Sequence, residues 1–134
     1  MRIDFRDISN VDSFINIPPG RYLCEVSDIK AGEDSDGSPR WVLRLQVAEG
    51  ELAGRLAGWD FLHWSERGLT RVRDVLQAFG VDTEGIVDIE PRDLQGRRAW
   101  VTFVAETKER GDRVIHTLSV PWRGYEALAE VRLD

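Results

Sequence analysis

The stretch that decides the expected fold is RLAGWDFLHWSERGLTRVRDVLQAFG, residues 55–80. Its first part, residues 55–64, is rich in aromatic residues and predicts a strand, and Gly58 inside it is typical of a bulge or a tight bend. The apolar residues that follow recur at three- and four-residue spacing: Leu69, Val72, Leu76 and Phe79. This spacing predicts a helix over residues 66–79, and Gly80 stands where a left-handed helix cap is expected.

Two strands are expected before this strand–helix unit and two after it. Their ranges are 21–30, 40–49, 97–106 and 113–120, separated by Gly-rich or polar turn signals. The resulting order, three strands, one helix and two strands, is that of the OB barrel. The sequence therefore predicts an all-β fold, a five-stranded OB-like barrel with one helix between strands 3 and 4. The barrel is expected in residues 18–134, after a polar lead-in at residues 1–17.

Composition excludes several classes of protein. A chain of 134 residues is expected to be one domain, and its one cysteine, Cys24, excludes a disulfide framework and a Cys-based metal site. No signal-peptide pattern and no stretch of membrane-spanning length occur, so a cytoplasmic protein without a membrane partner is expected. His63 and His116 lie in separate strands without metal-ligand spacing. We therefore expect no metal, no cofactor and no enzyme activity.

The charge is partly sorted along the chain. A net charge of −6 argues against a purely electrostatic nucleic-acid binder. However, residues 92–123 contain seven basic residues against four acids, whereas residues 82–90 contain four acids and no base. The closing hairpin is thus the element expected to face an anion. The alternative is a solvated surface on which Arg and Glu alternate.

Strand parity predicts which side chains face outward. In the second strand, Trp41, Leu43 and Leu45 are expected in the core, which turns Arg40 and Arg44 outward. Other residues expected in the core are Tyr22, Cys24, Val26, Leu76, Ala99, Val101, Phe103 and Ala105. The third strand is aromatic on both parities: Trp59, Phe61 and His63 share one face, and Leu62 and Trp64 share the other. In the fourth strand Arg98 and Trp100 are expected to face outward together.

Aromatic platforms and basic side chains on an OB barrel are typical of single-stranded nucleic-acid binding, because bases stack on the rings while cations follow the backbone. The candidate binding residues are Arg40, Arg44, Arg55, Trp59, Trp64, Arg98, Trp100, Lys108, Arg110 and Arg113. The alternative for each tryptophan is a place in the core, since Trp is highly buried on average. The alternative for each arginine is a solvated strand exterior.

Four short motifs occur in order along the chain. They are Pro18-Pro19-Gly20-Arg21-Tyr22, Gly50-Glu51-Leu52-Ala53-Gly54-Arg55, Ala78-Phe79-Gly80-Val81 and Leu94-Gln95-Gly96-Arg97. Over roughly residues 14–106 the chain resembles a family of small phage and prophage proteins of unknown function, often encoded among replication and recombination genes. The resemblance implies an OB-like protein of the single-strand-binding type, and Arg55 and Arg97 match the Gly-Arg turns of that family.

Two functions follow as hypotheses. The first is single-stranded DNA binding with little sequence preference, in phage or mobile-element replication or recombination. The second is a protein-interaction OB module that scaffolds phage or host replication and recombination proteins without binding DNA, which the negative net charge and the acidic connection at residues 31–39 favour. The sequence leaves the oligomeric state open, a homo-oligomer included.

Overall fold

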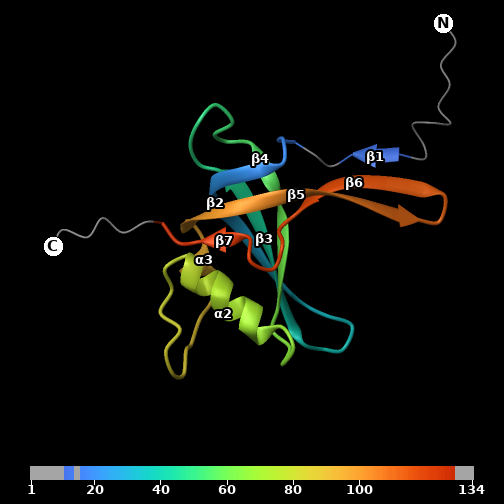
Figure 1. Cartoon of the computed structure of the whole chain (residues 1–134). Helices are drawn as coiled ribbons and strands as arrows, with labels where there is room; N and C mark the ends of the chain where they lie inside the picture. The colour runs from blue at the N-terminus through green and yellow to red at the C-terminus, as the bar shows by residue number, and fades with distance from the viewer. Residues whose placement is uncertain (1–10, 14–15, 129–134) are drawn as a thin grey trace, which may run out of the picture.

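The computed structural model describes residues 11–13 and 16–128, and a mostly antiparallel β-sheet dominates it (Figure 1). The strands are β1 (Val11–Ser13), β2 (Gly20–Glu33), β3 (Pro39–Val47), β4 (Leu56–His63), β5 (Arg98–Arg110), β6 (Arg113–Ser119) and β7 (Tyr125–Glu126). Helices α2 (Leu69–Ala78) and α3 (Pro91–Leu94) lie between β4 and β5. The predicted all-β class is confirmed. Each predicted strand range overlaps one of β2 to β6, but the described sheet has seven strands, so the predicted number of five is not confirmed.

The strands follow the order β1-β6-β5-β2-β3-β4, and β7 pairs with β5 outside this path. Strand β5 thus returns to lie beside β2, which is the 4-1-2-3 order of a Greek key for β2 to β5. The pairings of the long strands are antiparallel, and β1 runs parallel to β6 over three residues. In the described part of the chain β4 pairs only with β3, so the path is open: barrel closure is not confirmed, and the short β1 and β7 add to the five expected strands.

The core lies on the inward face of this curved sheet. Strand β3 alternates strictly, with Trp41, Leu43, Leu45 and Val47 buried, which confirms the predicted register. The other predicted core residues are also buried, except Tyr22 and Ala105. Tyr22 is half-buried and its hydroxyl donates to the Pro18 carbonyl at 2.6 Å. The prediction for Ala105 is wrong, because β5 continues past the core into the β5–β6 hairpin, where both faces meet solvent.

Helix α2 packs its apolar stripe against the sheet and ends as predicted. Val72, Val75 and Leu76 are buried, whereas Leu69, predicted on the same stripe, is 48% exposed because the helix begins only at this residue. Gly80 has a φ of 81°, and the Val81 amide donates to the Leu76 carbonyl at 2.9 Å. This is the bond that closes a Schellman cap, for which glycine is favoured.

The predicted lead-in is described only in part. Residues 1–10 and 14–15 lie outside the described residues, so the division of the chain at residue 18 stays a prediction. Residues 11–13 form β1 beside β6, and Ile17 is buried in the core. Among the described residues, no helix combines the length and the apolar character needed to cross a membrane.

Candidate nucleic-acid interface

The outward faces of β3 and β4 bring basic and aromatic side chains together. Across the two strands Arg44 pairs with Trp59, Val42 with Phe61 and Arg40 with His63. We call these six residues the β3–β4 ladder. Their sequence neighbours Trp41, Leu43 and Leu62 are buried, which turns the ladder outward, and Trp59 and Phe61 are 45% and 43% exposed. The predicted outward position of Arg40, Arg44 and Trp59 is thus confirmed, and Phe61 joins them.

Arg44 is the cation of the ladder that no carboxylate neutralises among the described residues. Its Nη1 donates to the Ser27 hydroxyl at 2.8 Å, and its guanidinium lies 5.9 Å from the centre of the Trp59 ring. A register shift between Val26 and Asp28 marks a bulge at Ser27. The bulge therefore places the uncharged Ser27 hydroxyl beside Arg44. The positive charge of Arg44 stays available to an anion.

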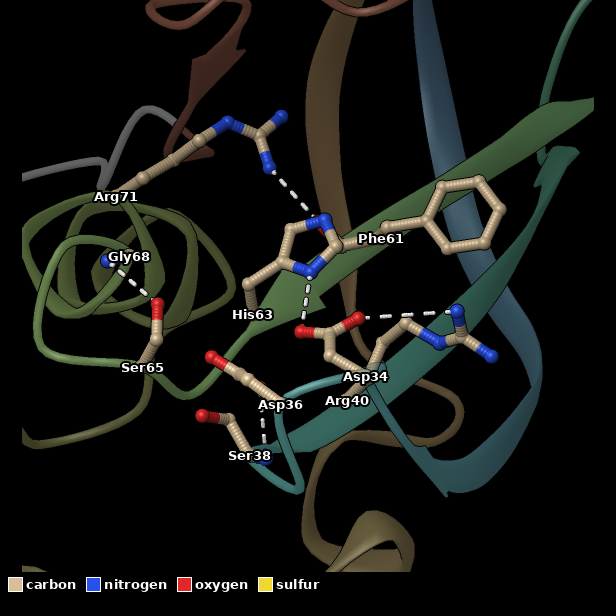
Figure 2. Close-up of polar contacts among 9 residues, drawn as sticks. All are labelled: Asp34, Asp36, Ser38, Arg40, Phe61, His63, Ser65, Gly68 and Arg71. Carbon is tan, nitrogen blue, oxygen red and sulfur yellow. Dashed lines mark hydrogen bonds and ion pairs between the residues drawn. The ribbon is translucent and has the colours of Figure 1, made fainter.

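A carboxylate lies beside Arg40 and His63 at the other end of the ladder (Figure 2). Asp34, in the loop between β2 and β3, lies 2.8 Å from His63 Nδ1 and 3.7 Å from Arg40 Nη1. In the same loop Asp36 accepts a hydrogen bond from the Ser38 amide, which lowers the pKa of that carboxyl. Because Arg40 has a carboxylate partner in Asp34 and Arg44 has none among the described residues, the more basic end of the ladder is the Arg44 end.

A partly buried polar cluster holds β4 from its inward side. Asp60 accepts from Arg71 Nη2 at 2.7 Å and from the Tyr125 hydroxyl at 2.5 Å, which ties β4 to α2 and β7. Burial and the nearby Asp60 charge raise the pKa of Tyr125 well above its ordinary value. Sequence reasoning missed this cluster. The available signal was Asp60 itself, a carboxylate that shares strand parity with the buried Leu62.

A groove of about 580 Å³ opens between β4 and the β5–β6 hairpin. Trp59 and Phe61 line one side, and Lys108, Thr117 and Ser119 line the other. Lys108 lies 3.8 Å from Glu106, which also lines the groove, and the two side chains are 50% and 39% exposed, so solvent screens this pair and Lys108 is neutralised only in part. We call this space the seam groove, because it lies between the two strands at which a closed barrel would meet.

Four further predicted binding residues lie on the β5–β6 hairpin or beside β4. Lys108 lines the groove. Arg110 and Arg113 lie opposite each other in the strand register, on either side of the turn at the hairpin tip. Arg55 is exposed just before β4 begins. Arg97, of the second Gly-Arg turn, instead donates to the carbonyls of Asp93, Phe79 and Gly80, so it supports the end of α2 and the α3 turn.

The predicted pair of Arg98 and Trp100 lies elsewhere. It faces outward beside β2, in a group that we call the β5–β2 patch: Arg21, Glu25, Arg98 and Trp100. Arg98 lies 3.9 Å from both Glu25 and Glu49, and the Arg21 guanidinium covers the Trp100 ring at 4.4 Å. The structure therefore does not join Arg98 and Trp100 to Arg44 in one surface, because β2 and its Glu25 lie between them.

Trp64 also lies apart from the ladder. Its ring is half-buried and packs on the Trp41 ring, with centroids 4.8 Å apart and planes at 59°. Its indole Nε1 is buried and has no hydrogen-bond partner among the described residues. Trp64 thus packs with the core, which is the alternative stated for each tryptophan, and Trp59 is the tryptophan of the ladder.

Most of the sequence matches a known protein family. A family model described as "Protein of unknown function (DUF669)" matches residues 4–120. The chain belongs to the DUF669 family. No curated protein matches it. The match contains the ladder, the seam groove and the β5–β6 hairpin, so the candidate site lies inside the DUF669 domain. In the described part of this domain no group of three or more His, Cys, Asp or Glu is placed to hold a metal ion.

Proposed function

We propose that this DUF669 protein is an OB-like, single-stranded DNA-binding protein with little sequence preference. The OB fold is a partly open five-stranded Greek-key barrel that binds ligands on its second and third strands and on the loops after its first and fourth strands. In this chain those positions correspond to β3, β4, the loop between β2 and β3, and the β5–β6 hairpin. The open path of β2 to β6 and the position of α2 support this assignment.

The observation that carries the proposal is the pairing of Arg44 with Trp59, which lines the seam groove. Trp59 and Phe61 offer two exposed rings, while Arg44 and Lys108 offer cations on either side of them. Bases stack on any aromatic face, so binding of this kind tolerates different sequences. A base inside a duplex is already stacked, which favours a single strand as the ligand.

The net charge of −6 sets the conditions under which binding is expected. Phosphate contacts come from few cations, so stacking supplies most of the affinity and the salt dependence is shallow. The resemblance to phage and prophage proteins further supports a place in phage or mobile-element DNA replication or recombination, in the cytoplasm. A role as a binding protein without enzyme activity belongs to the same proposal.

Titration with oligo-dT at low salt tests the proposal. The intrinsic tryptophan fluorescence is expected to be quenched, because a stacked base perturbs the Trp59 indole directly. Trp59→Phe keeps a ring but should lose most of the quenching, whereas the matched variant Trp100→Phe should keep it. Unchanged fluorescence together with no retention of the oligonucleotide at low salt would refute DNA binding.

The second candidate, a protein-interaction module, is supported by the outer edge of β4. Among the described residues this edge pairs with no other strand, and it borders the seam groove. Such an edge can accept an extended segment of another protein. Failure to bind oligo-dT, with capture of a replication or recombination protein by the wild type but not by Trp59→Ala, would favour this candidate.

A further inference from the structure

The connection between α2 and α3 presents apolar side chains among acids. Residues 81–90, which we call the acidic loop, contain Asp82, Glu84, Asp88 and Glu90 and no base. At its tip Ile86 is fully exposed and Val87 is 38% exposed. Glu84 and Asp88, on either side of the tip, form no ion pair among the described residues, whereas Glu90 pairs with Arg92 at 2.8 Å. The tip is therefore an apolar pair flanked by uncompensated negative charge.

Both ends of the acidic loop are fixed to the body of the protein. Val81 and Ile89 pack against the core, and Gln77 Nε2 of α2 donates to the Thr83 hydroxyl at 2.9 Å. At the far end Glu90 and Asp93 form a reciprocal capping box at the start of α3. Figure 1 shows the loop extending beside α2 and α3, away from the β5–β6 hairpin. Held in this way, the tip does not reach the seam groove of its own chain.

The seam groove has the chemistry that would complement this tip. Trp59 and Phe61 offer exposed apolar area inside it. Lys108 lines it together with Glu106, its partly exposed partner at 3.8 Å, and Arg44, beside Trp59, carries a charge with no carboxylate partner among the described residues. A volume of about 580 Å³ is within the range of small-molecule pockets, so it has room for two aliphatic side chains.

We propose that the acidic loop of one copy of this chain docks into the seam groove of a second copy. Ile86 and Val87 then lie against Trp59 and Phe61, and Glu84 and Asp88 face Arg44 and Lys108. The contact joins two different surfaces, so it is head-to-tail and can repeat into rings or longer chains. Because it covers the ladder, self-association excludes single-stranded DNA. Only this exclusion rests on the proposed function.

Sedimentation velocity over a wide range of protein concentrations tests the contact without any DNA. The wild type is expected to form dimers and larger species as its concentration rises, and added salt should dissociate them, since the contact pairs opposite charges. A wild type that stays monomeric at every concentration at low salt would overturn the proposal.

Two variants identify the surfaces. Ile86→Asp disables the loop and Trp59→Ala disables the groove, so each alone should stay monomeric. Mixed in equal amounts, they retain one intact loop and one intact groove, and should form a heterodimer and nothing larger. A mixture that stays monomeric while the wild type associates would refute the head-to-tail contact. The matched control is Leu69→Asp, an exposed apolar residue on α2 outside both surfaces, which should associate as the wild type does.

Oligo-dT separates this inference from the proposed function. Dilute Ile86→Asp should bind oligo-dT as tightly as dilute wild type, and at high protein concentration it should bind more tightly, because no loop competes for its groove. DNA bound without dissociation of the wild-type assembly would overturn the exclusion. If no oligo-dT binds at all, the proposed function fails, whereas the sedimentation result still decides the contact.

Discussion

The β3–β4 ladder and the β5–β2 patch contain the same two residue types on the same outward parity, yet they differ as binding surfaces. In the ladder, Trp59 is 45% exposed and Arg44 has hydroxyl and amide partners. In the patch, Trp100 carries Arg21 on its ring, and Arg98 lies between two glutamates. An outward Arg and Trp therefore make a stacking surface only where the neighbouring strand leaves the ring uncovered and the cation without a carboxylate.

The inward sides of the two regions differ as well. Under the ladder, Asp60 forms a partly buried network with Arg71 and Tyr125, whereas the inward neighbours of Trp100 in β5 are the buried Ala99 and Val101. The ladder thus depends on a polar network for its position, and the patch depends on apolar packing. Mutations can test each half of this comparison separately.

The largest effect is expected at Asp60. Asp60→Ala leaves the Arg71 charge without its partner in a site where both side chains are about 13–14% exposed. Removing one partner of such a pair should lower the free energy of unfolding by about 3–5 kcal/mol. Urea unfolding measures this loss, and Glu25→Ala, which removes an acid from the patch surface, is the control expected to change stability little. Equal losses in the two variants would contradict the claim that the ladder depends on its inward network.

An alkaline titration tests the apolar interior below the patch. Burial raises the pKa of Cys24 from 9.0 to about 12, so the folded protein holds this proton more tightly than the unfolded chain. The stabilisation is complete below pH 9 and is lost as the pH rises toward 12, by at most about 1.4 kcal/mol per pH unit. Unfolding of Cys24→Ala should depend less steeply on pH in this range, and the same slope in both proteins would contradict the prediction.

Strand parity was enough to predict which side chains face outward in the ladder and in the patch, but not what covers Trp100 and Arg98. The alternation in residues 40–47 fixes the register of β3, and the register alone turns Arg40 and Arg44 outward. What covers an outward residue depends on contacts across strands that are distant in sequence. Arg21 and Glu126, which meet beside Trp100, are 105 positions apart, and no local pattern predicts their ion pair.

The helix and its cap were predictable for the same local reason, whereas the open sheet was not. The Schellman bond from Val81 to Leu76 spans one turn of chain, so Gly80 in the sequence is sufficient to predict it. Whether β4 pairs with β6 depends on the curvature of the whole sheet, and the same gap creates the seam groove. The groove was therefore missed, although Trp59 and Lys108, which line it, were both among the predicted binding residues.

The comparison predicts unequal losses of DNA affinity. Trp59→Ala should weaken oligo-dT binding by about 1–3 kcal/mol, the contribution of stacking one base. Trp100→Ala should leave the Kd close to that of the wild type, because Arg21 already occupies the face of that ring. Fluorescence anisotropy of a labelled oligonucleotide measures both. A larger loss for Trp100→Ala would move the binding site to the patch.

The arginines should differ in salt dependence more than in affinity at one salt concentration. If Arg44 contacts one phosphate, Arg44→Gln should make the slope of log K against log salt shallower by about 0.7, the value for one phosphate of a single strand. Arg98→Gln should leave the slope unchanged, since Glu25 and Glu49 already neutralise Arg98. Titrations at several salt concentrations give the slopes, and equal changes in both variants would remove the distinction between the two regions.

The smallest effect is expected when the Trp100 ring is uncovered, and this change is also the most direct test of the comparison. Arg21 lies 4.4 Å from the ring centre and is held there by Glu126 at 2.6 Å. Arg21→Ala removes this cover and should lower the free energy of unfolding by about 0.5–1 kcal/mol, as expected for an exposed cation–π contact. Acrylamide should then quench the fluorescence of Arg21→Ala more strongly than that of the wild type. Glu126→Gln, which releases Arg21 without removing it, should give a smaller increase. If quenching is unchanged in Arg21→Ala, then Arg21 is not what separates Trp100 from solvent, and the contrast with Trp59 has to come from the strand packing of β5 and β2 alone.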